Sequence, residues 1–317
     1  MIRFEQVSKN FPNGTFAVKS LDFEIKKGEF FVLIGPSGSG KTTTLKMINR
    51  LIELTKGWVW INGKKISDYD INVLRWNIGY VLQQIALFPH MTIAENIAVV
   101  PELKNWDNEK ITARVDDLLN MVGLNPKEYR NRKPSELSGG QQQRVGVIRA
   151  LAADPEIILM DEPFSALDPF SREKLQDDML EIQRKLKKTI VFVTHDMQEA
   201  LKLGDRICLM KDGEIVQVGS PHELLANPEN DFVREFVGNR KLSINLNELI
   251  TAVTEGQVLS DTNTISLSAP INEVLEHLAS FEQVFVKDNG KVIGMIQRQN
   301  TLKVMSQFLR EGGQIHE

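Results

Sequence analysis

The sequence predicts an open α/β fold, in which short apolar strands alternate with amphipathic helices. Three observations support this fold class. A glycine-rich loop separates an apolar run at 29–34 from a helical pattern at 41–52, a run at 157–160 ends in two acids, and a run at 190–194 ends in a histidine. Open α/β sheets bind ligands at the carboxyl ends of their strands, so we expect these polar residues to face one site.

Composition and charge favour an ordinary globular protein of about two domains. The chain has 317 residues, of which 42% are hydrophobic and 25% charged, and its net charge of -4 gives no sign of nucleic-acid binding. No apolar run reaches the roughly 18 residues of a spanning helix, and the N-terminus lacks a signal-peptide core. We therefore expect a cytoplasmic chain. The single cysteine, Cys208, lies in an apolar run and is expected to be a buried packing residue.

The glycine-rich loop matches the pattern G-x-x-x-x-G-K-[ST] in full and has the strand and helix flanks that a phosphate loop requires. Its glycines let backbone N–H groups converge on phosphates, and the helix N-terminus adds a favourable dipole. Lys41 adds a point charge, and Thr42 is expected to place its hydroxyl on Mg²⁺. The predicted cofactors are thus ATP and Mg²⁺, held by Gly35, Pro36, Ser37, Gly38, Ser39, Gly40, Lys41, Thr42 and Thr43.

Two carboxylates, Asp161 and Glu162, directly follow the aliphatic run 157–160. Acids in that position are costly unless they are paired or bind a metal. A carboxylate aimed at a water in line with the γ-phosphate suits phosphoryl transfer, which depends mostly on positioning and charge stabilisation. His195 follows the run 190–194 at the equivalent strand end, although a histidine there is by itself more often structural.

A further motif begins at Leu137 and opens a helix that carries apolar residues from Val145 onward. Ser138 suits the N-cap, and the free N-terminus of the helix suits an anion. A cap explains the serine but not the two glycines and three glutamines that follow it. Ser138, Gly139, Gly140 and Gln141 are therefore expected to do more than cap the helix, at an N-terminus that is free to meet an anion.

The order and character of these motifs resemble the nucleotide-binding subunit of ABC transporters over about residues 1–240. The resemblance implies a P-loop NTPase fold of the ABC ATPase type, with a helical subdomain at about 87–155. It implies that Glu162 is the general base for the attacking water and that His195 is a switch residue that bonds the γ-phosphate. The catalytic residues would be Glu162, His195 and Gln83, and the metal ligands Thr42, Gln83 and Asp161.

The same resemblance assigns two further residues, each with a competitor. Gln83 would touch the metal and report the γ-phosphate to a membrane partner, with Gln84 as the near alternative. Phe11 would stack on adenine, with Phe16 as the competing candidate and a plain core role open for either.

The resemblance also implies partners. The signature at 138–141 would bind the ATP of an opposite subunit, and Asp168, in the loop 165–168, would cross the same interface, so a homodimer is expected. Residues 87–97 and the amphipathic helix 111–122 are similar to the importer subdomain that receives a permease helix. We therefore expect a peripheral protein at the cytoplasmic membrane face, with permease subunits and an extracytoplasmic solute-binding protein. DNA-repair and translation ATPases carry long insertions or two cassettes, so no nucleic-acid partner is expected.

After residue 240 the ATPase pattern stops, 241–263 is interpreted as a linker, and 311–317 as a tail. The segment 264–310 predicts strand, helix, strand, turn, strand and helix, at 265–267, 271–278, 284–286, 288–290, 292–296 and 301–308. This order resembles a single CBS motif, a small α/β unit that usually occurs in pairs. Its strands would need cover from the same unit of a second subunit, and nucleotide sensing stays open beside simple dimerisation.

An importer ATPase with this appendage resembles the group that takes up quaternary amines and betaines such as glycine betaine, choline and carnitine. The ATPase does not touch the solute, so this expectation depends on analogy. Import of another solute, such as an amino acid, stays open.

Overall fold

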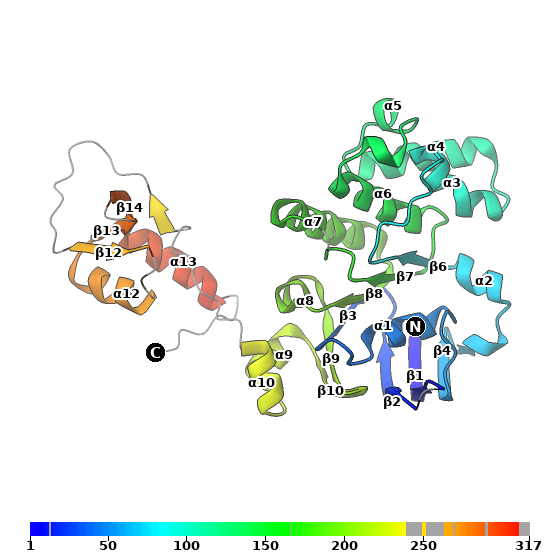
Figure 1. The fold of residues 1–317 in the computed structure, drawn as a ribbon, viewed down its shortest axis with the longest axis horizontal. Helices are drawn as coiled ribbons and strands as arrows, with labels where there is room; N and C mark the ends of the chain where they lie inside the picture. The colour runs from blue at the N-terminus through cyan, green and yellow to red at the C-terminus, as the bar shows by residue number, and fades with distance from the viewer. Residues whose placement is uncertain are drawn as a thin grey trace. The chain divides into compact units, whose positions relative to one another are not determined.

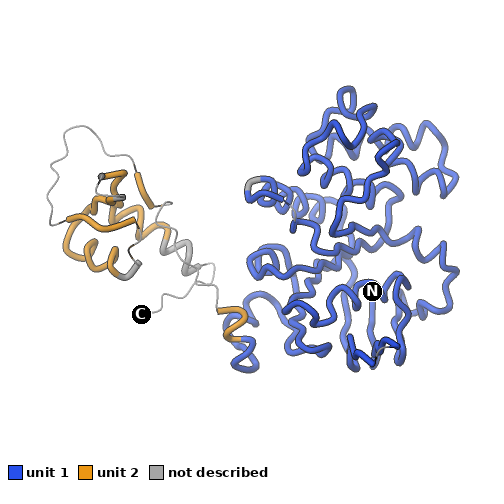
Figure 2. Tube along the Cα trace, viewed as in Figure 1, with its two compact units in different colours: residues 1–233 blue, residues 234–317 orange. Residues whose placement is uncertain are grey.

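The computed structural model describes residues 1–12, 14–165, 167–238, 249–251, 263–267, 269, 271–288 and 291–310 (Figure 1). The chain divides into two compact units, residues 1–233 and 234–317 (Figure 2). Most of the expected linker 241–263 and the whole expected tail 311–317 lie outside the described residues. Among the helices of the described part, none has the length and apolar character needed to cross a membrane.

A six-stranded sheet forms the centre of the first unit, in the order β10-β9-β3-β8-β7-β6. Its strands are β3 (Phe30–Ile34), β6 (Ile78–Val81), β7 (Ile157–Asp161), β8 (Thr189–Thr194), β9 (Arg206–Lys211) and β10 (Glu214–Gly219). All pairs are parallel except β9 with β10. Every residue of β3, β7 and β8 is buried, as expected for central strands covered on both faces. The strands that precede the predicted site residues are thus neighbours.

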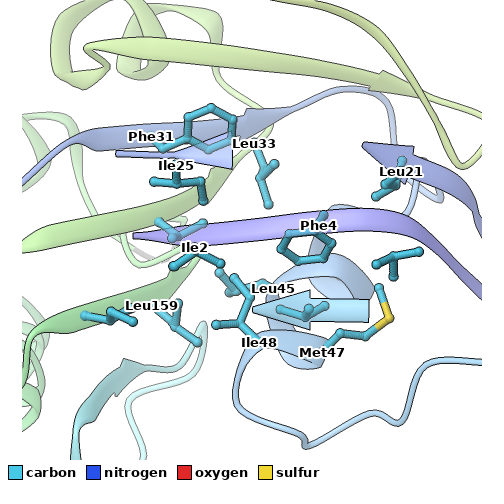
Figure 3. Packing of buried hydrophobic residues seen from close by; sticks show 14 of the residues in the cluster. Ile2, Phe4, Leu21, Ile25, Phe31, Leu33, Leu45, Met47, Ile48 and Leu159 are labelled. Carbon is cyan, nitrogen blue, oxygen red and sulfur yellow. The ribbon is translucent and has the colours of Figure 1, made fainter. Parts of the chain in front are cut away.

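An antiparallel sheet of order β2-β1-β4-β5 lies beside it, formed by β1 (Ile2–Asn10), β2 (Phe16–Ile25), β4 (Lys56–Ile61) and β5 (Lys64–Lys65). Phe4, Leu45 and Leu159 belong to one apolar cluster that joins this sheet, the helix α1 (Lys41–Ile48) and the central sheet (Figure 3). Cys208 lies in the same cluster, and burial raises the pKa of its thiol to about 12. Its predicted role as a buried packing residue is confirmed.

Helix α1 is shorter than the apolar pattern predicted. The pattern continued to Ile52, but α1 ends at Ile48 with Asn49 as its C-cap. Arg50 adopts φ 54°, a left-handed conformation that terminates helices. The N–H groups of Leu51 and Ile52 then turn back to the carbonyl oxygen of Lys46, at 3.0 and 3.1 Å.

The helices α3 to α6 gather in one region of the first unit, in the part of the chain expected to form a helical subdomain (Figure 1). They are α3 (Ile93–Leu103), α4 (Asn108–Met121), α5 (Pro126–Tyr129) and α6 (Gly139–Leu151). The remaining helical segments of this unit are η1 (Ile66–Asp68), α2 (Ile71–Trp76), η2 (Pro134–Glu136), α7 (Pro169–Leu186), α8 (Met197–Leu203) and α9 (Pro221–Ala226), while α10 (Asp231–Gly238) spans the division between the units.

The described residues of the second unit contain a sheet of order β11-β14-β13-β12 and, after the end of α10, the helices α12 and α13. Its elements are β11 (Ile250–Thr251), β12 (Thr264–Ser266), α12 (Ile271–Ser280), β13 (Gln283–Asp288), β14 (Lys291–Gln297) and α13 (Arg298–Arg310). The predicted order of strands and helices is confirmed, although residues 289 and 290 of the expected turn lie outside the described residues.

The central strands of this second sheet are covered on both faces within the chain. Val284 and Val286 pack in a cluster with Val274 of α12. Phe285, which alternation places on the opposite face, is only 2% exposed, and its cross-strand neighbour Met295 only 4%. The expectation that these strand residues need cover from a second subunit is therefore wrong for Phe285 and Met295.

Candidate functional site

The glycine-rich loop connects β3 to α1, and two of its glycines meet other backbone segments closely. A Cβ at Gly35 would overlap the carbonyl oxygen of Met210, and one at Gly40 would overlap that of Ala17. Gly40 is also the N-cap of α1, with φ 97°. Only glycine fits these positions, so the sequence pattern has a steric cause in this fold.

The interior of the loop presents a cation and an unpartnered hydroxyl. The ammonium of Lys41 donates hydrogen bonds to the carbonyl oxygens of Gly35 and Pro36, at 2.8 and 2.9 Å. Burial lowers the pKa of Lys41, while the nearby Glu162 and Asp161 carboxylates act in the opposite direction. Ser39 is 2% exposed, and its hydroxyl has no hydrogen-bond partner among the described residues. A buried cation and an unsatisfied donor are the groups that a phosphate would satisfy.

Asp161, the last residue of β7, is 5% exposed and gathers three polar groups around its carboxylate. The Thr42 hydroxyl donates a 2.8 Å hydrogen bond, and the Tyr80 hydroxyl donates one of 3.4 Å. The Lys46 ammonium lies at 3.7 Å. Burial, followed by the Asp161 charge, raises the pKa of Tyr80 above its usual value, so Tyr80 remains a donor.

The donor set at Asp161 fits Mg²⁺ in the presence of a nucleotide. No group of three or more His, Cys, Asp or Glu side chains suited to a metal occurs in the described ranges. Mg²⁺ prefers oxygen and commonly uses one or two carboxylates together with phosphates and water. Thr42 and Asp161 supply a hydroxyl and a carboxylate at hydrogen-bond distance, which suits that kind of site.

Glu162 faces a different set of partners. Its Oε2 accepts a hydrogen bond from the Gln83 amide at 3.3 Å and lies 3.1 Å from Nδ1 of His195. The backbone of Glu162 has φ 45°, an uncommon conformation for a residue other than glycine. It is held by a hydrogen bond from its N–H to the carbonyl oxygen of Val193 and by one from the Ser165 hydroxyl to its own carbonyl. The fold therefore brings together the three residues predicted to be catalytic.

The signature residues form a separate local structure. Ser138 caps α6 in a mutual arrangement with Gln141, because each side chain accepts a hydrogen bond from the other's backbone N–H, at 3.3 and 2.9 Å. The predicted N-cap is confirmed. Among the described residues, no hydrogen bond or ion pair joins 138–141 to the loop 35–43. Asp168 is the N-cap of α7 and accepts from the N–H of Ser171, while Ala166 lies outside the described residues.

The two adenine-stacking candidates differ in exposure. Phe11 is half-buried, with the Lys9 ammonium 5.1 Å from its ring centroid. Phe16, the first residue of β2, is 58% exposed. Both are compatible with stacking, and the choice of Phe11 remains a prediction.

Several residues at the site were missed by sequence reasoning. Tyr80 and Lys46 contact Asp161, and Glu199 hydrogen-bonds to Thr194 directly before His195. Tyr80 and Lys46 carry no local signal. Glu199 does carry one, since it shares a buried face of α8 with Leu203, four residues on, where an acid is unexpected.

The arrangement can accept a proton from a water and neutralise charge beside it. Glu162 presents a carboxylate between an amide and an imidazole, and Lys41 lies close enough for its pKa to be affected by that carboxylate. Such a pairing of a positioned base with fixed positive charge is what hydrolysis of a phosphoanhydride requires.

Comparison with known proteins agrees with this geometry. Residues 18–165 match the sequence profile described as "ABC transporter". The glycine betaine/carnitine/choline transport ATP-binding protein OpuCA of Bacillus subtilis (strain 168) is 59% identical over 242 residues, which are 76% of this chain and 63% of that protein. The match thus spans less than two thirds of that relative's length.

Two further comparisons cover more of the matched protein. The osmoprotectant import ATP-binding protein OsmV of Salmonella typhimurium is 48% identical over 307 residues, which are 94% of this chain and 79% of that protein. A solved dimeric ATP-binding cassette, in a post-hydrolysis state with ADP and phosphate, is 38% identical with a TM-score of 0.63, covering 70% of this chain and 99% of that one. With its phosphate loop and paired strand-end carboxylates in place, the chain belongs to the ABC transporter family and has the ABC ATPase fold.

Proposed function

We propose that this chain is the ATP-hydrolysing subunit that powers import of a quaternary amine or betaine-type solute through a separate membrane permease. The observation that carries the hydrolytic part is the position of Glu162, whose carboxylate lies between Gln83 and His195. On the neighbouring side, Asp161 is bonded to Thr42 of the phosphate loop. The proposed base and the proposed metal-binding carboxylate thus lie at the carboxyl end of the same buried strand.

The residues divide the work of hydrolysis by their chemistry. Bound ATP with Mg²⁺ supplies the phosphoryl group that passes to water. Lys41 would exchange its bonds to loop carbonyls for phosphate oxygens, and Thr42 and Asp161 would hold the metal. Glu162 accepts the proton of the attacking water, while His195 and Gln83 fix the direction of its carboxylate. Ser138 and Asp168 would serve the nucleotide of a second subunit.

The partners we propose are a second copy of the chain, permease subunits and an extracytoplasmic solute-binding protein, with this subunit at the cytoplasmic face of the membrane. Among the described residues, no hydrogen bond joins 138–141 to the phosphate loop of the same chain, which supports a site shared by two subunits. Phe88 and Leu103, at the helical subdomain, are 44% and 57% exposed, and each is available for contact with a permease helix. A nucleic-acid role has no support in the net charge of -4.

The solute class is supported by the relatives. One is named for glycine betaine, carnitine and choline transport, and another for osmoprotectant import. Import of a different solute, such as an amino acid, is the alternative. Purifying the chain with its permease and binding protein, and measuring which amine the binding protein retains, would distinguish the two.

We assign the segment 264–310 to a single CBS-like unit that supports dimerisation. Its order of strands and helices supports the assignment. Phe281, Ile293 and Leu302 are between 39% and 58% exposed and are available for a second copy. Binding of a nucleotide by this unit is the alternative, and sedimentation of a chain cut after residue 241 tests the dimerisation role.

Substitution of Glu162 tests the hydrolytic proposal. Glu162→Gln should reduce steady-state ATP hydrolysis by about a hundredfold or more while ATP binding persists, because an amide cannot accept the proton. Lys41→Ala should instead weaken ATP binding itself, since it removes a charge-assisted contact. Hydrolysis and equilibrium nucleotide binding would be measured on the same preparations.

Glu53→Gln is the matched control, because Glu53 is an exposed carboxylate outside the site and the chemical change is identical. It should behave as the unsubstituted chain. Near-normal hydrolysis by Glu162→Gln in the presence of the permease would exclude Glu162 as the base.

A further inference from the structure

A small hollow beside Glu162 contains a buried acid to which the proposed mechanism gives no task. The hollow is lined by Glu162, Ser165, Arg172, Thr194, His195, Asp196 and Glu199. Glu199 is 6% exposed and lies on α8. No cation lies within ion-pair distance of it among the described residues. A buried carboxylate without a paired cation is costly, so its presence calls for a physical reason.

The carboxylate of Glu199 is committed to one hydroxyl. Thr194 donates a 2.5 Å hydrogen bond to Oε2 of Glu199. The hydroxyl proton of Thr194 points to Glu199, so the lone pairs of its oxygen are free to accept other hydrogen bonds. This oxygen accepts a 2.9 Å hydrogen bond from the backbone N–H of Asp196. The two bonds bracket His195, the residue between Thr194 and Asp196.

The turn that carries His195 has little other support for the imidazole. The His195 side chain is 58% exposed, and Glu162 is its hydrogen-bond partner within the described part of the chain. The direction of the ring, and with it the contact to Glu162, therefore depends on how firmly the backbone of the turn is held. The Thr194 hydroxyl supplies a hydrogen bond at each side of that turn.

Charged groups around the hollow are consistent with an ionisable, desolvated carboxylate. Burial raises the pKa of Glu199, with Asp196 acting in the same direction. The Thr194 hydrogen bond, Arg172 and His195 oppose that shift. Arg172 lies 3.9 Å from the carboxylate of Asp196 and donates to the carbonyl oxygen of Leu167.

We propose that Glu199 is a positioning residue, which acts through the Thr194 hydroxyl to fix the turn bearing His195 and thereby the direction of the Glu162 carboxylate. The inference rests on the roles proposed for His195 and Glu162. It goes beyond them by naming the group that orients the histidine.

Three variants of the purified full-length chain test this route, each measured for kcat and KM of Mg-ATP hydrolysis. Glu199→Ala should lower kcat about tenfold with KM changed less than about twofold, since the nucleotide contacts are untouched. Glu199→Gln keeps an acceptor oxygen for Thr194 and should retain kcat within about threefold. Thr194→Val, which removes the hydroxyl at similar shape, should lower kcat about as much as Glu199→Ala.

The double variant Glu199→Ala/Thr194→Val should be no slower than about the slower single variant, because both act through one hydrogen bond. Glu29→Ala is the matched control, since Glu29 is likewise 6% exposed but precedes β3 at the opposite strand end. It should lower the melting temperature and leave kcat unchanged while the protein is folded.

Wild-type kcat in Glu199→Ala would overturn the proposal, and so would equal losses in Glu199→Ala and Glu199→Gln. Additive losses in the double variant would also overturn it. Glu162→Gln, run in parallel, separates this failure from that of the proposed function. If Glu162→Gln hydrolyses ATP normally, the function itself is wrong, whereas if only the Glu199 variants are normal, the function stands without this positioning role.

Discussion

At the residue scale, Asp161 and Glu162 are adjacent in the chain but serve different neighbours. Asp161 faces Thr42, and the left-handed backbone of Glu162 turns its carboxylate toward His195. A residue held at φ 45° costs of order 1–3 kcal/mol, which the surrounding hydrogen bonds must offset. The arrangement gives the proposed metal-binding acid and the proposed base separate surroundings although they are adjacent in the sequence.

Asp154, which follows α6, provides a residue-scale test of electrostatics. It pairs with Lys188 at 2.9 Å and with Arg114 at 3.8 Å. The hydrogen bond from Lys188 is the main cause that lowers the pKa of Asp154 below 3.8. The folded state therefore favours the ionised carboxylate, so this stabilisation is present above the unfolded pKa and is lost as pH falls through the folded one.

Asp154→Asn should lower the free energy of unfolding at pH 7 by about 0.5–1 kcal/mol, a small value because exposed pairs are screened by water and salt. The difference from the unsubstituted chain should shrink below pH 3.8 and with added salt. Thermal unfolding across pH measures both effects. Asp117→Asn, at an exposed aspartate for which no ion pair is found within the described residues, is the control. A pH-independent difference would contradict the electrostatic cause.

At the scale of elements, most apolar side chains of the central strands in the second unit are buried within the chain itself. Phe285 and Val286 are buried although they point to opposite faces of β13. The large apolar side chains that remain exposed among the described residues of this unit are Phe281, Ile293 and Leu302. Stable interfaces bury about 1,200–2,000 Å² in total, so these side chains can add to a dimer rather than hold it alone.

A chain cut after residue 241 should retain ATP hydrolysis per folded subunit. Its monomer–dimer midpoint should move to higher concentration by about threefold to tenfold, because the second unit no longer adds contacts between subunits. Sedimentation across a concentration series without nucleotide measures the shift. Leu302→Asn in the full chain should reproduce part of it. Identical profiles for cut and full-length chains would remove the dimerisation role.

At the scale of the whole molecule, each chain carries one phosphate loop and one signature. Among the described residues, no hydrogen bond joins the two. A pair of chains would then form two composite sites, each with a loop from one subunit and a signature from the other. With two inactivating substitutions in different chains, activity would then depend on whether both substitutions fall in the same composite site.

Mixing inactive Lys41→Ala chains with inactive Ser138→Arg chains should restore activity. In a mixed dimer one site is intact and the other carries both lesions, so random pairing gives about a quarter of wild-type sites. ATP hydrolysis after mixing, with labelled chains to show that mixed dimers form, measures the rescue. Dimers of Lys41→Ala alone are the control. No rescue in proven mixed dimers would contradict independent composite sites.

Local chemistry explains what the sequence by itself determined. The phosphate loop, the buried strands that lead to Asp161 and His195, the Ser138 cap and the strand and helix order after residue 264 all depend on residues close together in the chain. Hydrophobic periodicity, helix capping and the steric limits on glycine positions each involve only a few neighbouring residues, so they can be predicted from the sequence. The predicted end of α1 was wrong, because the apolar pattern continues beyond Ile48 while the left-handed backbone of Arg50 stops the helix.

The tertiary structure alone decided which of these pieces meet. The order β8-β7-β6 brings His195, Glu162 and Gln83 into hydrogen-bond distance, and no spacing in the sequence encodes the order of strands in a sheet. The same holds for Tyr80 on Asp161 and for the burial of Phe285, because each depends on contacts between elements rather than within one. Local patterns in the sequence are enough to identify the side chains of this site. Packing between distant segments decides how far apart these side chains lie and which charges are close to each other.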